Sequence, residues 1–209
     1  MPAYREHDIT LASFAQIDRE AKKYASGHDF SEAEYAIARR IVHTTADFDF
    51  LQLLQFHGDP VAAAGRALKK GSSIVTDVSM VAAGIGTVVR RTWDLPVVVA
   101  LQQAPARLLP GQPRSALGIR RCSRDHPDAV EVVGNAPTAL LAVCEDIAAN
   151  RIRPAVVIGA PVGFINVVES KQALAALSVP HILVSGRKGG SAVAAAILNA
   201  LMIWTWEQS

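Results

Sequence analysis

The sequence predicts an α/β protein, a three-layer α/β/α arrangement around a five-stranded, mainly parallel sheet, with an N-terminal helical section packed on it. Helical periodicity fills residues 1–71 and changes near residue 72 to short β-branched runs that alternate with helical segments. These runs are continuous and rich in β-branched residues, as in strands of a parallel sheet that is buried on both faces. We expect one domain over 1–209, with a helical section (1–71) and a parallel-sheet section (72–209).

The helical section is expected to contain three helices. Its apolar residues recur at three- to five-residue steps, with helices at 10–24, 31–43 and 60–69. The second helix begins with a capping box, in which the Ser31 hydroxyl can accept a backbone amide while the Glu34 carboxylate reaches back. Gly71 ends the third helix.

The second section is expected to alternate strands with helices. The predicted strands are 73–77, 96–101, 130–133, 154–158 and 181–184. Helices are expected from 79 and 114 onward and at 137–149, 168–177 and 191–204, with a Pro/Gly loop at 108–113. Pro137 stands at the first turn of its helix, where its missing N–H costs nothing.

Composition indicates an ordered globular protein. Half of the 209 residues are hydrophobic and 19% are charged. A domain of this size buries roughly 70% of its unfolded surface, which is enough to fold without a disulfide or a metal. The net charge of +2, with no long basic run, argues against a nucleic-acid partner.

The sequence also predicts a cytoplasmic protein with no membrane partner. The N-terminal residues lack the features of a signal peptide. The longest apolar stretch, 192–204, contains Asn199 and is shorter than the about 20 residues that span a bilayer. Cys122 and Cys144 lie far apart outside any C-x-x-C pattern, so we expect reduced thiols.

A ligand site is expected beyond the carboxyl ends of the parallel strands, where open α/β sheets bind their ligands. The turns there are 77–80, 102–103, 134–138, 159–164 and 185–191. Most of them place Gly, Ser, Thr or Asn near a helix N-terminus, where exposed amides bind carboxylates or phosphates. Ordinary strand-to-helix turns use the same residues. Several such turns on one edge favour a binding site.

Standard catalytic motifs are mostly absent. The Gly84-Ile85-Gly86 string lacks the third glycine of the dinucleotide fingerprint, and 186–191 lacks P-loop spacing. No G-x-S-x-G or H-E-x-x-H occurs, and no histidine pair has metal-ligand spacing on one helix face. A hydrolase, a zinc enzyme or a nucleotidase therefore has little support, and no metal site is expected.

His43 stands apart from the other histidines. It closes an apolar helix and precedes Thr44, Thr45 and the acidic-aromatic run 47–50. A histidine at the edge of an apolar face can donate a proton and take it back, which contributes roughly 10²–10⁴-fold in rate. From the residues alone, a cationic histidine that caps the helix carbonyls is the more ordinary interpretation.

Taken together, these strings resemble the precorrin-8X methylmutase (precorrin isomerase) family. The matching strings run along most of the chain and keep the family's order and spacing: Ser13-Phe14, 40–48, Thr76-Asp77, 80–85, 114–116, 134–140, 159–164, 169–171 and 187–191. One such match could arise by chance, but the whole set could not. Pro113 departs from the pattern, because the family usually has Thr there and a hydroxyl contact is lost.

The resemblance implies that a methyl group moves between neighbouring carbons on ring C of precorrin-8X or cobalt-precorrin-8, giving hydrogenobyrinate or cobyrinate in cobalamin biosynthesis. It implies that His43 matches the histidine that protonates the macrocycle. It also implies a homodimer, with the pocket near the subunit interface, and no organic cofactor. The run that follows His43 resembles the branch acting on cobalt-containing substrate. Such a methyl shift needs the macrocycle held in one conformation and one proton placed on it.

The implied partner is a polycarboxylated corrinoid, whose carboxylate arms need hydrogen-bond donors. The expected substrate-binding residues are Ser13, Arg40, Thr44, Asp77, Met80, Arg114, Asn135, Gly163, Gly189 and Gly190. Arg40 and Arg114 would bind carboxylates in bidentate fashion, and the turn amides would add donors. Asp77 more plausibly orients its neighbours than binds an anion, although it could also be a plain helix-entry carboxylate.

Two other functions fit parts of the pattern. A non-catalytic corrinoid carrier would use the same pocket, and product in excess over enzyme would argue against it. A flavodoxin-like flavin or nucleotide binder is motivated only by the alternating strand pattern. A purified protein that is colourless and does not respond to flavin would argue against that function.

Overall fold

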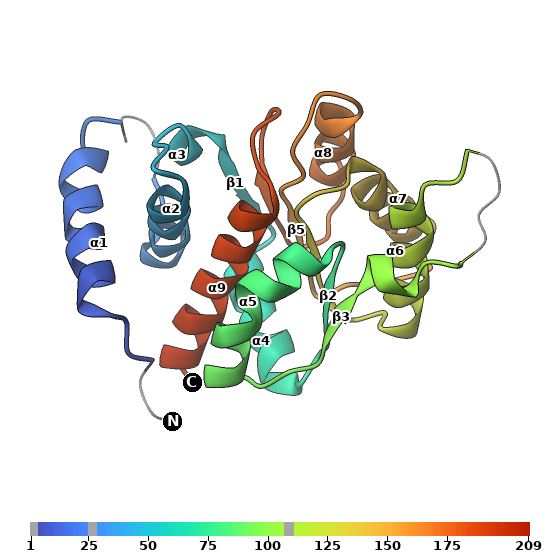
Figure 1. Cartoon of the computed structure of the whole chain (residues 1–209), viewed down its shortest axis with the longest axis horizontal. Helices are drawn as coiled ribbons and strands as arrows, with labels where there is room; N and C mark the ends of the chain where they lie inside the picture. The colour runs from blue at the N-terminus through green and yellow to red at the C-terminus, as the bar shows by residue number, and fades with distance from the viewer. Residues whose placement is uncertain (1–3, 25–28, 107–110) are drawn as a thin grey trace.

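The computed structural model describes residues 4–24, 29–106 and 111–209, and Figure 1 shows a six-stranded sheet between two layers of helices. The strands are β1 (Leu54–His57), β2 (Ile74–Thr76), β3 (Val97–Val99), β4 (Val130–Val133), β5 (Val156–Gly159) and β6 (His181–Val184). Their order in the sheet is β1-β6-β5-β4-β2-β3. All neighbouring pairs are parallel except β1 with β6. The mainly parallel α/β sheet is confirmed.

The prediction of five strands was wrong by one, because β1 was missed. β1 is the antiparallel edge strand that pairs Leu54 with Val184. Leu54 is buried, whereas Gln55 and His57 are exposed. An edge strand that faces solvent at alternate positions lacks the β-branched, mostly apolar run that revealed the other five.

The helices lie close to their predicted positions. They are α1 (Asp8–Ala21), α2 (Glu32–Thr45), α3 (Phe50–Leu53), α4 (Pro60–Lys70), α5 (Ser79–Arg91), α6 (Arg114–Asp125), α7 (Pro137–Ala148), α8 (Val167–Ala175) and α9 (Ser191–Glu207). The four-residue α3 was not predicted, and a 3₁₀ turn, η1 (Ala100–Gln103), takes the end of the strand predicted at 96–101. Of the predicted 108–113 loop, 107–110 lie outside the described residues.

The helix boundaries follow from local chemistry. The capping box of α2 is confirmed: the Glu34 amide donates to the Ser31 hydroxyl at 3.3 Å, and the Ser31 amide donates to the Glu34 carboxylate at 2.9 Å. Gly71, with φ of +88°, ends α4 in the left-handed conformation that glycine adopts without strain.

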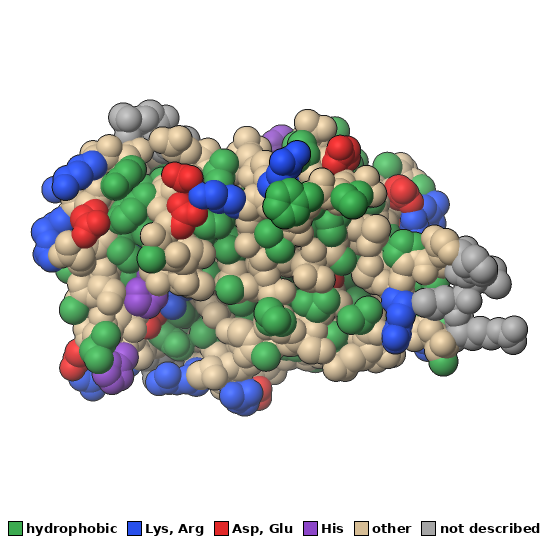
Figure 2. All heavy atoms as spheres, turned by 45° about the horizontal axis from the view of Figure 1, so that its top comes forward, with side chains coloured by type: hydrophobic (Ala, Val, Ile, Leu, Met, Phe, Trp, Pro, Cys, Tyr) green, Lys and Arg blue, Asp and Glu red, His purple; other side chains and the backbone are tan. Residues whose placement is uncertain are grey.

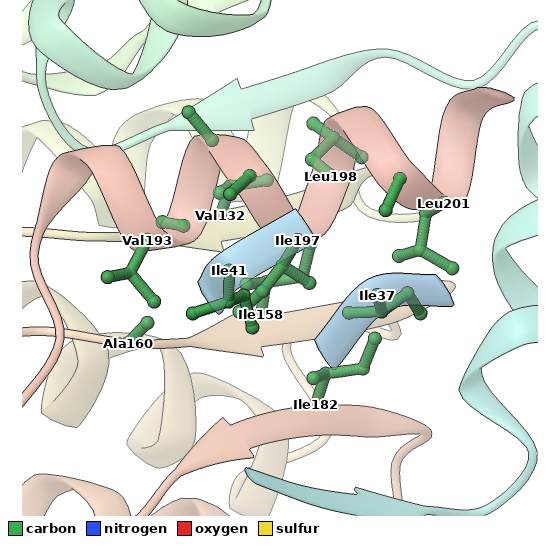
Figure 3. Close-up of a cluster of buried hydrophobic side chains, with 14 of the residues drawn as sticks. Ile37, Ile41, Val132, Ile158, Ala160, Ile182, Val193, Ile197, Leu198 and Leu201 are labelled. Atoms are coloured by element: carbon green, nitrogen blue, oxygen red, sulfur yellow. The ribbon is translucent and has the colours of Figure 1, made fainter. Parts of the chain in front are cut away.

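Two hydrophobic cores cover the two faces of the sheet. On one face α2, α4, α5 and α9 pack against the sheet, while α6, α7 and α8 cover the other (Figure 1). Figure 3 shows the first core, in which Ile197 of α9 meets Ile41 of α2 and Ile158 of β5. All three are fully buried, and each such side chain stabilises the fold by about 1.5–3 kcal/mol. The core therefore fixes α2, and with it the helix end that bears His43.

Within the described ranges, no helix combines the length and the apolar character needed to cross a membrane.

Candidate active site

The candidate site lies along the edge of the sheet where the parallel strands end. Asp77, Gly134, Ala160 and Ser185 directly follow β2, β4, β5 and β6. Because these four strands are parallel and adjacent in the order β6-β5-β4-β2, the four turns open at the same edge. The topology thus brings the predicted turns together.

The helices that begin at this edge have no side-chain caps. α5, α6, α7, α8 and α9 each follow a parallel strand, and none of these five described helices has a side-chain hydrogen bond at its N-cap. By contrast, α1, α2 and α4 are capped by His7, Ser31 and Asp59. Uncapped first-turn amides carry partial positive charge and suit anionic groups of a ligand.

Asp77 fastens the neighbouring turn rather than facing a ligand. Its side chain is buried, and the backbone amides of Gly134, Asn135 and Ala136 donate to its carboxylate at 3.1, 2.8 and 2.8 Å. Burial raises the pKa of Asp77, and these amide bonds oppose the rise. The amides of this turn are therefore already paired, while the Asn135 side chain is exposed.

The turns after β5 and β6 hold each other. The Gly190 amide donates to the Ala160 carbonyl at 2.8 Å, and the Gly163 amide to the Arg187 carbonyl at 3.4 Å. Gly189 has φ of +147°, and a Cβ there would lie 2.4 Å from the Ala160 oxygen. Only glycine permits this close approach of the two backbones. The Gly163 and Gly190 amides thus bond protein acceptors in this arrangement.

Exposed apolar side chains lie beside these turns. Met80 is 70% exposed, Phe164 85% and Ile165 79%. The Arg187 guanidinium lies over the Phe164 ring, with its carbon 5.7 Å from the ring centre. Figure 2 shows hydrophobic side chains spread between charged ones across the face that this edge contributes to. Exposed apolar side chains of this size suit contact with an apolar part of a ligand.

His43 lies in the last turn of α2, with an exposed side chain. Its ring meets the edge of Phe14 at 5.3 Å between ring centres. The imidazole lines a hollow of about 370 Å³ between α1 and α2, to which Ser13 and Phe48 also contribute. Its ring nitrogens have no hydrogen-bond partner within the described residues, so the structure does not place His43 as a carbonyl cap.

An ionic link joins this helix end to the glycine loop at 185–190. The Lys188 ammonium lies 2.6 Å from the Asp47 carboxylate and 2.7 Å from that of Asp49. Lys188 lowers the pKa of Asp47 by this hydrogen bond. Asp47 is four residues from His43, so the imidazole and the glycine turns share one end of the molecule.

The remaining predicted residues fall into two groups. Ser13, Arg40 and Thr44 lie near His43 on α1 and α2. The Ser13 and Thr44 hydroxyls each donate at 2.8 Å to a carbonyl of their own helix. The Arg40 guanidinium pairs with the Glu6 carboxylate and lies 5.4 Å from the Phe14 ring centre. At the sheet edge, Arg114 is exposed at the start of α6.

One buried residue of this edge was not among the predicted site residues. Lys171 of α8 is 2% exposed, and its ammonium donates to the carbonyls of Gly186 and Lys188 at 2.7 Å each. The resemblance includes Lys171 in a matching string, but nothing in the sequence shows which loop it contacts. In the part of the chain that the structure describes, no cluster of His, Cys, Asp and Glu forms a metal site.

Comparison with known proteins gives a consistent result. Residues 8–204 match the family model described as precorrin-8X methylmutase. A cobalt-precorrin-8 methylmutase from Synechocystis is 46% identical, over 97% of this chain and 98% of that protein. A precorrin-8X methylmutase from Pseudomonas aeruginosa is 38% identical, over 92% and 93%. The crystal structure of a Thermus thermophilus precorrin-8X methylmutase superposes with a TM-score of 0.83 at 36% identity, covering 95% and 98% of the two chains.

Proposed function

The chain belongs to the precorrin-8X methylmutase family, and on this premise we propose that His43 is the proton donor and acceptor for a methyl shift on ring C of precorrin-8X or cobalt-precorrin-8. The protein is an isomerase of cobalamin biosynthesis. The reaction moves a methyl group within one molecule, so no second substrate is consumed. The work of the protein is then to hold the macrocycle and to place one proton.

The observation that carries this proposal is the shared edge of the sheet. Five helix N-termini without side-chain caps open there, and Met80, Phe164 and Ile165 present apolar surface beside them. A reduced tetrapyrrole has the matching chemistry, a broad apolar ring with several carboxylate arms. The ring would lie on the apolar side chains, and the arms would meet the helix amides and Arg114.

The exposed imidazole of His43 supports its part in the proton transfer. The Phe14 ring restricts the imidazole from one side, and the hollow between α1 and α2 leaves it accessible. His43 would deliver a proton to the macrocycle, and the same group would take a proton back after the methyl group has moved. The Arg40–Glu6 pair, packed on Phe14, would hold this side of the site.

We further propose that the chain acts as one domain over 1–209 and as a cytoplasmic homodimer. Ile41 of the helical section and Ile158 of the sheet share one core, which supports a single unit. The resemblance implies a pocket near the subunit interface, so a second subunit would contact Phe164 and Ile165 from beside the bound ring. Light scattering of the purified chain at several concentrations tests the dimer, and a monomer throughout would contradict it.

The proposed reaction is tested by incubating the purified chain with precorrin-8X and with cobalt-precorrin-8 in separate assays. The visible spectrum should change to that of the product, with many equivalents of product per enzyme. Binding without conversion would contradict the reaction and would identify a corrinoid carrier instead. Comparing the two substrates shows which of them the protein prefers.

A further inference from the structure

We propose that Lys171 is a positioning residue for the reaction, one that holds the 185–190 loop in the shape that binds a carboxylate arm of the tetrapyrrole. This inference rests on the proposed function for its ligand. The structural role of Lys171 does not depend on that function and can be measured separately.

Lys171 reaches the loop from beneath, out of solvent. It lies on α8, 2% exposed, and its ammonium donates to the Gly186 and Lys188 carbonyls at 2.7 Å each. These carbonyls are two residues apart, so one ammonium sets the curvature of the segment between them. An ammonium has three N–H donors and a compact charge, which suits it to bridge two backbone oxygens.

The burial of this amine is costly, which argues that its position is maintained for a purpose. No carboxylate in the described ranges forms an ion pair with Lys171. Burial lowers the pKa of Lys171 to about 8, because the charged form loses its hydration. Methionine would fill the same space without that cost. Unlike methionine, the ammonium donates hydrogen bonds to two carbonyls of the loop.

Several contacts fasten the loop, and the contact from Lys171 comes from a buried side chain. The Gly190 amide bonds the Ala160 carbonyl, and the Lys188 ammonium bonds Asp47 and Asp49. Three residues of the loop are glycines with positive φ: Gly186, Gly189 and Gly190. Because glycine has no side chain, few side-chain contacts restrain the backbone between these attachments. Without Lys171, the Gly186 and Lys188 carbonyls lose their donor and the loop can relax.

The loop matters to a ligand because it delivers the start of α9 to the site. Gly190 is the N-cap of α9 and gives it no side-chain cap, so the first-turn amides remain open. A carboxylate arm held there would be bound in the ground state and in the transition state alike. Loss of the loop geometry should therefore raise KM much more than it lowers kcat.

The test replaces Lys171 with Met, with Lys70→Met as the matched control on the exposed face of α4. We expect KM for the tetrapyrrole to rise about ten- to a hundredfold in K171M, the factor that a charge-assisted hydrogen bond is worth, with kcat within a few fold. Hydrogen exchange should show faster exchange of the Gly190 and Gly163 amides and unchanged protection in β4 and β5. K70M should match the wild type in all three measurements.

A second variant keeps the test decisive if K171M folds poorly. K171A leaves a cavity whose missing atoms correspond to propylammonium, and adding that cation should restore both KM and the Gly190 protection. Wild-type KM and wild-type loop protection in K171M, or in K171A without the amine, would overturn the proposal. If the wild type itself does not turn over, the exchange data still decide the loop role, so the two failures are distinguishable.

Discussion

The buried carboxyl of Glu131 should make the stability of this protein fall as the pH rises. Glu131 lies in β4, in register with Val75 of β2 and Val157 of β5, and is fully buried in the core beneath α6 and α7. Neither carboxyl oxygen has a hydrogen-bond partner within the described residues. Burial raises the pKa of Glu131 to about 8 from 4.5, because the charged carboxylate would lose its hydration.

The sign and size of the effect follow from this shift. The folded state keeps a proton that the unfolded state releases near pH 4.5, so the stabilisation is complete below that pH. It is lost progressively as the pH rises through about 8. Each pH unit between these values costs about 1.4 kcal/mol, so the full loss is on the order of 5 kcal/mol.

The assay compares Glu131→Gln with the wild type by urea unfolding at pH 5, 6, 7 and 8. Glutamine matches the protonated carboxyl in shape and cannot ionise, so its advantage over the wild type should grow by about 4 kcal/mol between pH 5 and 8. Burial lowers the pKa of His181, so this residue makes stability rise with pH. Both proteins contain His181, and its effect therefore cancels in the difference between them. The exposed Glu32→Gln variant serves as the control. A constant difference across this pH range would refute the reasoning.

Two further predictions concern the sheet edge. Asp77→Asn should lower the free energy of unfolding by about 2 kcal/mol, because the asparagine side chain offers one acceptor oxygen to three backbone amides. Urea unfolding measures this loss, and wild-type stability would contradict the prediction. Gly189→Ala should lower kcat/KM at least about tenfold, because its Cβ would meet the Ala160 oxygen at 2.4 Å and the loop must move. Gly86→Ala, which meets only the flexible Arg90 side chain, is the control, and equal kcat/KM in both variants would contradict the loop argument.

The fold could be predicted because strands buried on both faces leave short continuous runs that are mostly β-branched and apolar. Val130–Val133 and His181–Val184 were located in this way to the residue. The edge strand β1 escaped prediction because half of its side chains face solvent. For the site, the alternating pattern was enough to place the turns at one edge, since parallel strands share their carboxyl ends.

The pairings inside the site could not be predicted, because they depend on strand order and on long-range contacts. Asp77 reaches the 134–136 turn because β4 lies beside β2 in the sheet, although β3 comes between these two strands in the sequence. The Arg40–Glu6 pair and the grip of Lys171 on Gly186 likewise join residues far apart in the sequence. Sequence can name such residues as polar and well placed, but it cannot say which partner each one has.

The most direct test of the central claim separates proton transfer from binding at His43. In His43→Ala, turnover of the tetrapyrrole should fall roughly 10²–10⁴-fold while its dissociation constant stays within a few fold. His57→Ala, an exposed histidine of β1, should keep wild-type turnover. Turnover near the wild-type rate in His43→Ala, at saturating substrate, would contradict the assignment of His43 as the proton donor and acceptor.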